Sequence, residues 1–258
     1  MDTELDFTGR TILVTGSGRN IGRAIIVEFA ARGANVVVNA RSNRAEAEDV
    51  ADEARALGAE ALVVIGEAAD PIVVATMKAE AEARFGRVDI SVSNAARRPF
   101  KDFWETTDDD WHHYLNQQLS ASWYLAKAFA PGMRDAGFGR IIHINGPDGY
   151  AGGWTRVPHS TAKGGLRALT KSLARGLGAH GITVNDINPG YTETVRDPET
   201  HPFLIGEVNR AETVARIPIG RGTDPRELAF ACAFLCSVPA GCITGSCLHV
   251  DGGMSMLG

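Results

Sequence analysis

The stretch Thr15-Gly16-Ser17-Gly18-Arg19-Asn20-Ile21-Gly22 decides the fold of this chain. It follows a short apolar run, Thr11–Thr15, and precedes apolar residues at helical spacing over Ile21–Arg32. A glycine-rich turn between a strand and a helix presents backbone N–H groups to a phosphate, and the helix dipole favours the negative charge. Taken alone, glycines at this spacing indicate an ordinary surface turn about as strongly as a phosphate-binding turn. The strand-turn-helix context therefore carries the prediction of a nucleotide-binding turn.

Short apolar runs alternate with helical segments along the rest of the chain. Runs that are apolar nearly throughout are typical of strands that a parallel sheet buries on both faces. The predicted strands are Thr11–Thr15, Asn35–Asn39, Ala61–Ile65, Asp89–Ser93, Arg140–Ile144, Thr183–Ile187 and Cys247–Val250. The predicted helices are Ile21–Arg32, Arg44–Leu57, Ile72–Phe85, Asp108–Ala136 with a bend near Pro131, Thr161–Ala179 and Pro225–Cys236. This alternation predicts the α/β class, with a three-layer, doubly wound parallel sheet. We expect one dinucleotide-binding domain over residues 1–258, with a small substrate lobe at about 191–218.

Composition excludes several classes of function. The chain has 258 residues, 44% of them hydrophobic, and a net charge of −5 without any basic block, which argues against a nucleic-acid partner. No apolar run is long enough to span a membrane, and the first residues do not resemble a signal peptide, so we expect a cytoplasmic protein. The cysteines form no Cys-x-x-Cys pair, which predicts buried, reduced thiols and no metal site. They are Cys232, Cys236, Cys242 and Cys247.

The order of the motifs resembles the short-chain dehydrogenase/reductase family, of the 3-oxoacyl-carrier-protein reductase and glucose dehydrogenase type. The family's Thr-Gly-x-x-x-Gly-x-Gly is matched by Thr15 to Gly22, with Asn20 in place of the middle glycine. Its Asn-Asn-Ala-Gly, Pro-Gly and Val-Asp-Gly-Gly are matched by Ser93-Asn94-Ala95-Ala96, Pro189-Gly190 and Val250-Asp251-Gly252-Gly253. The resemblance covers essentially the whole chain and implies a Rossmann-like sheet with strand order 3-2-1-4-5-6-7.

The end of the second strand bears on the choice of cofactor. It carries no acid to hold the ribose 2′-hydroxyl of NAD, whereas Arg41 and Arg19 can reach the 2′-phosphate of NADP. The alternative is that both arginines are solvated surface charges. We expect NADP(H), with NAD as the alternative. We expect Asn20 to weaken binding of the cofactor. The alternative is that this chain has lost cofactor binding. The predicted cofactor-binding residues are Gly16, Ser17, Arg19, Asn20, Ile21, Gly22, Arg41, Ser42, Glu67, Asn94, Ala95, Lys163, Pro189, Gly190 and Thr194.

The catalytic positions depart from the family. Where the family uses Asn, Ser, Tyr and Lys, the resemblance places Gln118 (or Asn116, if the helix register slips), Gly146, His159 and Lys163. Loss of a positioned general acid or base costs roughly 10²–10⁴-fold in rate. Imidazole has a reference pKa near 6.5, and a neighbouring lysine keeps it neutral and base-like. His159 can therefore replace the tyrosine in proton transfer.

Other polar residues have less certain roles. Side chains that the resemblance places around the cleft, as replacements for the missing serine, are Asn145, Tyr150, Trp154 and Tyr191. His143 is predicted to be a satisfied core residue, and His112 and His113 to be solvated. Arg97 and Arg98 are either solvated or face an anionic substrate.

Three functions stay open. The first is an NADP-dependent oxidoreductase that acts on the carbonyl or alcohol of a small molecule, with His159 in place of the tyrosine. The second is a catalytically silent homologue within a mixed oligomer. The third is a non-redox enzyme of lyase or isomerase type that uses His159 as base. The resemblance implies a homotetramer, or a hetero-oligomer with a sister short-chain dehydrogenase, through the two long helices and the last strand.

Overall fold

The strands form one parallel sheet. The structure is a computed structural model that describes residues 5–98, 100–195 and 207–256. In these residues seven strands pair in the order β3-β2-β1-β4-β5-β6-β7, which confirms the predicted fold class and strand order. Their bounds are Thr11–Val14 (β1), Asn35–Ala40 (β2), Ala61–Ile65 (β3), Ile90–Ser93 (β4), Gly139–Ile144 (β5), Ile182–Pro189 (β6) and Cys247–Val250 (β7).

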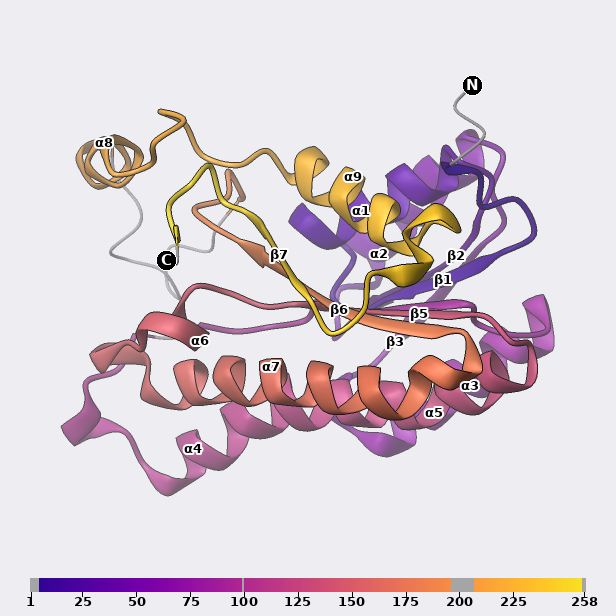
Figure 1. Cartoon of the computed structure of the whole chain (residues 1–258), viewed down its shortest axis with the longest axis horizontal. Coiled ribbons are helices and arrows are strands. Elements are labelled where there is room, and N and C mark those ends of the chain that lie inside the picture. Colours follow the sequence, from indigo (N-terminus) through magenta and orange to yellow (C-terminus); the bar gives the residue numbers. More distant parts are fainter. Residues whose placement is uncertain (1–4, 99, 196–206, 257–258) are drawn as a thin grey trace.

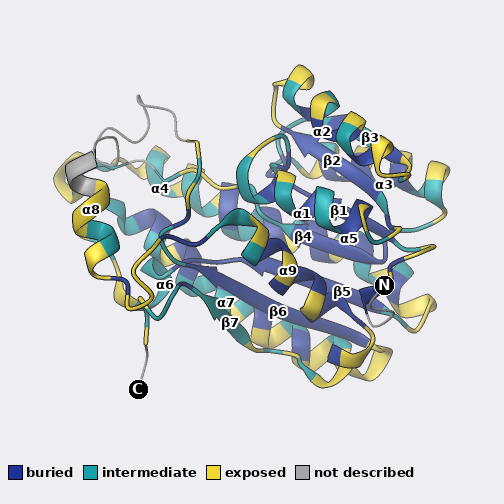
Figure 2. Ribbon diagram, turned by 90° about the horizontal axis from the view of Figure 1, so that it is seen from above, coloured by how far each residue is buried: buried dark blue, intermediate teal, exposed yellow. Residues whose placement is uncertain are grey.

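Helices cover both faces of the sheet, as Figure 1 shows. On one face lie α1 (Asn20–Ala30), α2 (Arg44–Ala56) and α9 (Pro225–Cys236), and on the other α3 (Pro71–Phe85), α5 (Ala121–Asp135) and α7 (Val157–Leu177). Each face has its own apolar core, built around Phe29 on one side and Phe129 on the other. The inner strands β2, β1, β4, β5 and β6 are buried almost throughout, whereas the edge strands β3 and β7 are mostly half-buried (Figure 2). This burial explains why their sequences are continuously apolar.

The strand order reverses beside β1. Val14 at the end of β1 pairs with Val38 of β2 on one side and with Val92 of β4 on the other. Chain crossovers run in opposite directions from such a point and leave a crevice at the carboxyl ends of the strands, where ligands of open α/β sheets bind.

One predicted helix is divided. The expected helix Asp108–Ala136 consists of α4 (Asp108–Leu115), a π-helical turn η3 (Asn116–Ser120) and α5. The helix is interrupted at η3, whereas α5 continues through Pro131, which lies on its exposed side. A carbonyl that loses its partner to a proline can bond to water there, so the helix continues.

Helix α7 begins earlier than predicted. It starts at Val157 rather than Thr161, which places His159 on its first turn. Pro158 at the start of the helix is tolerated, because the first helical N–H groups have no intrahelical partner. The predicted lobe at about 191–218 contains a further helix, α8 (Glu207–Ala215), which the sequence did not indicate. Residues 196–206 of this lobe lie outside the described part of the chain.

The cysteines are only partly as predicted. Cys232 and Cys236 are buried on α9, but Cys242 is exposed in the turn after α9 and Cys247 is half-buried on the edge strand β7. The prediction of burial was therefore wrong for Cys242 and Cys247, which follow α9 in the chain and lie outside the apolar core.

None of the described helices is long and apolar enough to cross a membrane.

Candidate functional site

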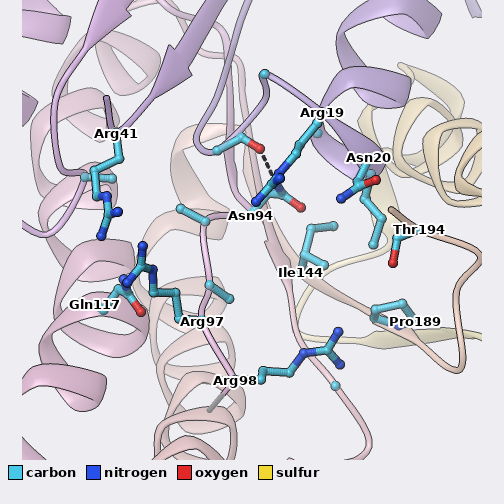
Figure 3. Close-up of a pocket in the computed structure, with 18 of the residues that line it drawn as sticks. Arg19, Asn20, Arg41, Asn94, Arg97, Arg98, Gln117, Ile144, Pro189 and Thr194 are labelled. Carbon is cyan, nitrogen blue, oxygen red and sulfur yellow. Dashed lines mark hydrogen bonds between the residues drawn. The ribbon is translucent and has the colours of Figure 1, made fainter. Parts of the chain in front are cut away.

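A cavity of about 440 Å³ opens at the carboxyl ends of the strands (Figure 3). Its volume is in the range of small-molecule and cofactor sites. The structure brings most of the predicted site residues together in its lining. They are Gly16, Arg19, Asn20, Ile21, Gly22, Arg41, Ser42, Glu67, Asn94, Ala95, Gly146, His159, Lys163, Pro189, Gly190 and Thr194. Ser17 and Gln118 are buried elsewhere.

The glycine-rich turn has no room for side chains at two positions. Gly16 has a φ of +61°, which favours glycine. A Cβ on Gly22 would lie 2.6 Å from the carbonyl oxygen of Gly16. Asn94 at the end of β4 fixes the turn by donating from Nδ2 to the carbonyls of Thr15 and Gly16. The turn is therefore held tightly against the start of α1.

Two N–H groups of the glycine-rich turn are occupied by hydrogen bonds within the protein. Those of Gly16 and Ser17 donate to Asn39 on β2, and the hydroxyl of Ser17 donates to the carbonyl of Val14 at 2.7 Å. Ser17 thus anchors the turn instead of facing the cavity. By contrast, no side chain in the described part of the chain caps the N-terminus of α1, whose first residues, Asn20 and Ile21, line the cavity. An uncapped helix N-terminus fits a phosphate.

Asn20 has the only positive φ, +54°, among the described non-glycine residues. Its side chain turns to Val195 after β6, donating from Nδ2 to the carbonyl at 2.9 Å and accepting from the N–H at 3.0 Å. The side chain that replaces the family's glycine therefore bridges the turn to the segment after β6.

Arginines gather at the end of the cavity beside β2, which we call the adenosine end (Arg19, Arg41, Ser42). Figure 3 shows Arg19 and Arg41 on either side of it, with Arg97 also directed there. Glu46 of α2 lines the same end and is an acid that the sequence reasoning missed. It follows Asn43, the N-cap of α2, and a search for acids beyond the strand end would have found it.

The opposite, catalytic end of the cavity (Gly146, Asp148, His159, Lys163) is built on α7 and the chain after β5. Lys163 is one turn after His159, and its Nζ donates to the carbonyl of Ile144 at 2.7 Å. Burial, with a smaller contribution from the charge of Arg98, lowers the pKa of Lys163 to about 8. Burial also lowers the pKa of His159 to about 4, although Asp148 opposes the shift. His159 is therefore neutral at pH 7.

Asp148 is a site residue that the sequence reasoning missed. Its Oδ2 lies 3.4 Å from Nε2 of His159 and 3.0 Å from Nη1 of Arg156. Burial would raise the pKa of Asp148, but the hydrogen bond from His159 and the charge of Arg156 outweigh it and lower the pKa. A Cβ on Gly149 would lie 2.8 Å from the backbone of Lys163, so the chain after β5 packs closely onto α7. This packing brings the carboxylate to the imidazole.

The predicted Asn and Ser positions do not supply polar groups to the cavity. Gln118 is buried and donates from Nε2 to the carbonyl of Arg97 at 3.1 Å, and the alternative Asn116 donates to the carbonyl of Ala69. Among the described residues, no atom lies within 4 Å of where a Cβ of Gly146 would be, so they leave open space at this position.

The expected replacements for the serine lie mostly outside the cavity. The hydroxyl of Tyr150 lies 3.2 Å from the ring nitrogen Nε2 of His249, and Trp154 is largely exposed and donates to Asp102. Tyr191 does not line the cavity, whereas Asn145 does and donates to the buried carboxylate of Asp186.

Three further histidines, His143, His112 and His113, do not line the cavity. His143 is buried, with Nδ1 2.6 Å from the hydroxyl of Thr170 but Nε2 without a partner, so it is only half satisfied. His112 and His113 are exposed on α4, as predicted.

Comparison with known proteins agrees with this geometry. Residues 16–255 match the family model described as enoyl-(acyl carrier protein) reductase. The chain is 37% identical over 253 residues to 3-oxoacyl-[acyl-carrier-protein] reductase FabG of Escherichia coli K12, covering 98% of this chain and 100% of the relative. It is 35% identical to L-rhamnose 1-dehydrogenase (NAD(P)(+)) of Sphingomonas sp. SKA58, covering 95% and 96%.

Solved structures give the same result. A gluconate 5-dehydrogenase from Burkholderia cenocepacia J2315, in complex with NADP and tartrate, superposes with a TM-score of 0.90 at 32% identity, covering 99% of this chain and 98% of that one. A short-chain dehydrogenase/reductase from Serratia marcescens superposes with a TM-score of 0.88 at 31% identity, covering 96% and 99%. The chain belongs to the short-chain dehydrogenase/reductase family of oxidoreductases.

Proposed function

We propose that this chain is an NADP-dependent oxidoreductase that interconverts an alcohol and a carbonyl compound, with His159 as the proton-transfer group. One observation carries the proposal: His159 and Lys163 open onto the same cavity as the uncapped N-terminus of α1. A base and a phosphate cradle on one cavity suit a reaction between a small molecule and a dinucleotide.

The described residues fit NADP. The first turn of α1 would bind the pyrophosphate, Arg41 and Arg19 the 2′-phosphate, and Thr194 the nicotinamide amide. Lys163 would hold the ribose. When bound, NADP supplies the hydride acceptor. Support comes from the relatives, since the rhamnose dehydrogenase is named for NAD(P)(+) and the Burkholderia structure contains NADP.

The charge states favour alcohol oxidation at neutral pH. His159 is neutral and its Nε2 is 3.4 Å from the carboxylate of Asp148, longer than a strong charge-assisted hydrogen bond. A substrate hydroxyl can therefore replace Asp148 as the partner of Nε2. In that arrangement the single proton of the neutral ring is on Nδ1, so Nε2 accepts the hydrogen bond and takes the proton of the hydroxyl. Asp148 then stabilises the imidazolium, and Arg156 keeps the carboxylate in place.

The test compares wild type with His159→Asn, using His112→Asn on the surface of α4 as matched control. NADPH affinity is measured by fluorescence titration, and turnover of a panel of alcohols with NADP⁺ by absorbance. We expect unchanged NADPH affinity in both variants and a loss of roughly 10²–10⁴-fold in kcat/KM for His159→Asn only. Absence of NADPH binding to wild type would overturn the proposal. Binding without His159-dependent turnover would instead indicate the silent member of a mixed oligomer.

A further inference from the structure

A buried carboxylate lies beside the catalytic end and has no part in the proposed reaction. Asp186 is on β6, is only 2% exposed and does not line the cavity. Its Oδ1 accepts from the hydroxyl of Thr170 on α7 at 2.6 Å, and its Oδ2 accepts from Nδ2 of Asn145 at 3.1 Å. Asp186 thus binds both segments that carry the groups of the catalytic end, α7 and the chain after β5.

His143 belongs to the same cluster but does not bring a positive charge to it. Its residue pairs in register with Asp186 across β5 and β6. Because the one hydroxyl proton of Thr170 goes to Asp186, the oxygen of Thr170 accepts from Nδ1 of His143 at 2.6 Å. Nε2 of His143 is buried and has no partner among the described residues. A second proton on this ring would therefore have no acceptor, which is costly in a buried site.

Lys163 is the cation that adjoins the cluster. Its Nζ donates to the carbonyl of Ile144, the residue directly before Asn145. On α7 it precedes Thr170 by seven residues, which places the two on nearly the same side of the helix. Figure 1 shows α7 alongside β6, with which it packs. The ammonium of Lys163 and the carboxylate of Asp186 are therefore fixed by neighbouring groups of the same two segments.

Charges from several elements act on Lys163. After burial, Arg98 on the loop after β4 contributes to the lowered pKa of Lys163, whereas Asp186 and, to a smaller extent, Asp148 oppose the lowering. His159, one turn earlier on α7, is neutral at pH 7. Since Coulombic effects decline with distance, the carboxylate of Asp186 lies near enough to favour the charged form of the amine.

We propose that Asp186 is a positioning residue of the catalytic end, whose buried carboxylate, held by Thr170 and Asn145, keeps Lys163 charged and in place. Asp186 acts through Lys163 and touches neither substrate nor cofactor. The consequence for the ribose of the cofactor rests on the proposed function, whereas the charge of Lys163 can be measured without cofactor.

The first experiment follows Lys163 directly. The chain is labelled with [¹³Cε]lysine and titrated without cofactor between about pH 6 and pH 10, and the resonance is assigned with Lys163→Met. Wild type is compared with Asp186→Asn. The matched control is Asp89→Asn, since Asp89 is another buried carboxylate, bound by Arg10 and Arg87 at the opposite end of the sheet. Each of these two variants differs from wild type at one position, so all other charges near Lys163 are the same.

We expect Lys163 of wild type to titrate at about pH 8. Asp186→Asn should lower this midpoint by roughly one pH unit, and Asp89→Asn should not move it. A loss of stability alone would not produce such a shift. An unchanged or raised midpoint in Asp186→Asn overturns the inference.

A second variant covers the case in which Asp186→Asn does not fold. His143→Leu, Thr170→Val and Asp186→Val are combined, because replacing all partners of a buried polar cluster with apolar groups of similar size is often tolerated. The same downward shift of the Lys163 midpoint is expected, and its absence overturns the inference equally.

The second experiment measures the consequence for the cofactor, by fluorescence titration with NADPH at pH 6 and at pH 8. At pH 6 Lys163 is charged in wild type, Asp186→Asn and Asp89→Asn, so the affinities should be equal. At pH 8 Asp186→Asn should bind NADPH roughly three- to tenfold more weakly, because most of its Lys163 has lost the charge. An equal loss at both pH values would indicate a general structural effect and would contradict the positioning role.

The two proposals fail separately. A lowered Lys163 midpoint in Asp186→Asn, in a chain that binds no NADPH at either pH, would remove the proposed redox function and keep the role of Asp186. Binding of NADPH and His159-dependent turnover, with the same Lys163 midpoint in wild type and Asp186→Asn, would keep the function and remove that role.

Discussion

Asn20 and Val195 are joined by two reciprocal hydrogen bonds, although 175 residues separate them in the chain. The amide of Asn20 pairs with both backbone groups of Val195, as a neighbouring strand would. This bridge links the turn at the start of α1 to the segment that follows β6, across the cavity. It also explains how asparagine is accommodated where the family has glycine.

Removing the bridge should loosen the segment after β6. We expect Asn20→Gly to speed amide hydrogen exchange at Val195 by roughly tenfold, since each lost hydrogen bond is worth about 1 kcal/mol. Hydrogen-exchange mass spectrometry of the peptide over residues 191–195 measures it. Asn20→Asp keeps the acceptor for the N–H of Val195 and should retain protection at that amide. Equal exchange in wild type and Asn20→Gly would show that the bridge does not form in solution.

Two glycines of the catalytic end should respond differently to a side chain. Gly146 has open space beside it, so Gly146→Ala should leave the melting temperature nearly unchanged. At Gly149 a Cβ would meet the backbone of Lys163 at 2.8 Å, so Gly149→Ala should lower the free energy of unfolding by about 1–3 kcal/mol. Thermal and denaturant unfolding of the two variants test the pair. A destabilised Gly146→Ala variant would contradict the open space beside this glycine.

The sequence predicts the frame of this site better than its chemistry. Apolar runs and the glycine-rich turn identify the strands and the cavity, because burial on both faces and close backbone approach restrict residue choice strongly, whereas the order of the strands came from the family resemblance. Asp148 could not be identified in this way, since its role depends on how the chain after β5 packs against α7. The resemblance assigns Gln118 to the family's asparagine position, but only its place on η3 shows that its amide donates to the carbonyl of Arg97.

Arg41 should determine the preference for NADP. Arg41→Ala removes the guanidinium proposed to bind the 2′-phosphate of NADPH and leaves the carboxylate of Glu46, which repels that phosphate. The affinity for NADPH should therefore fall by roughly 10- to 100-fold. Affinity for NADH should not change. Arg44→Ala is the matched control, because Arg44 is exposed, pairs with Glu48 and does not line the cavity. Fluorescence titration with both cofactors measures the ratio, and an equal loss for NADH would place Arg41 outside the phosphate site.

Burial of neutral His159 should make the stability of the fold depend on pH. Its pKa is about 4 in the folded chain and near 6.5 when unfolded, so between these values the unfolded chain binds more protons. The free energy of unfolding should therefore rise with pH across this window and fall on acidification. From pH 7 to pH 5 the loss due to His159 is on the order of 2 kcal/mol. Urea unfolding at both values measures it, with His159→Asn as the variant in which this part of the loss is absent. An identical pH dependence in wild type and His159→Asn would mean that the imidazole is protonated in the folded chain at pH 5, and would remove the neutral base from the proposed reaction.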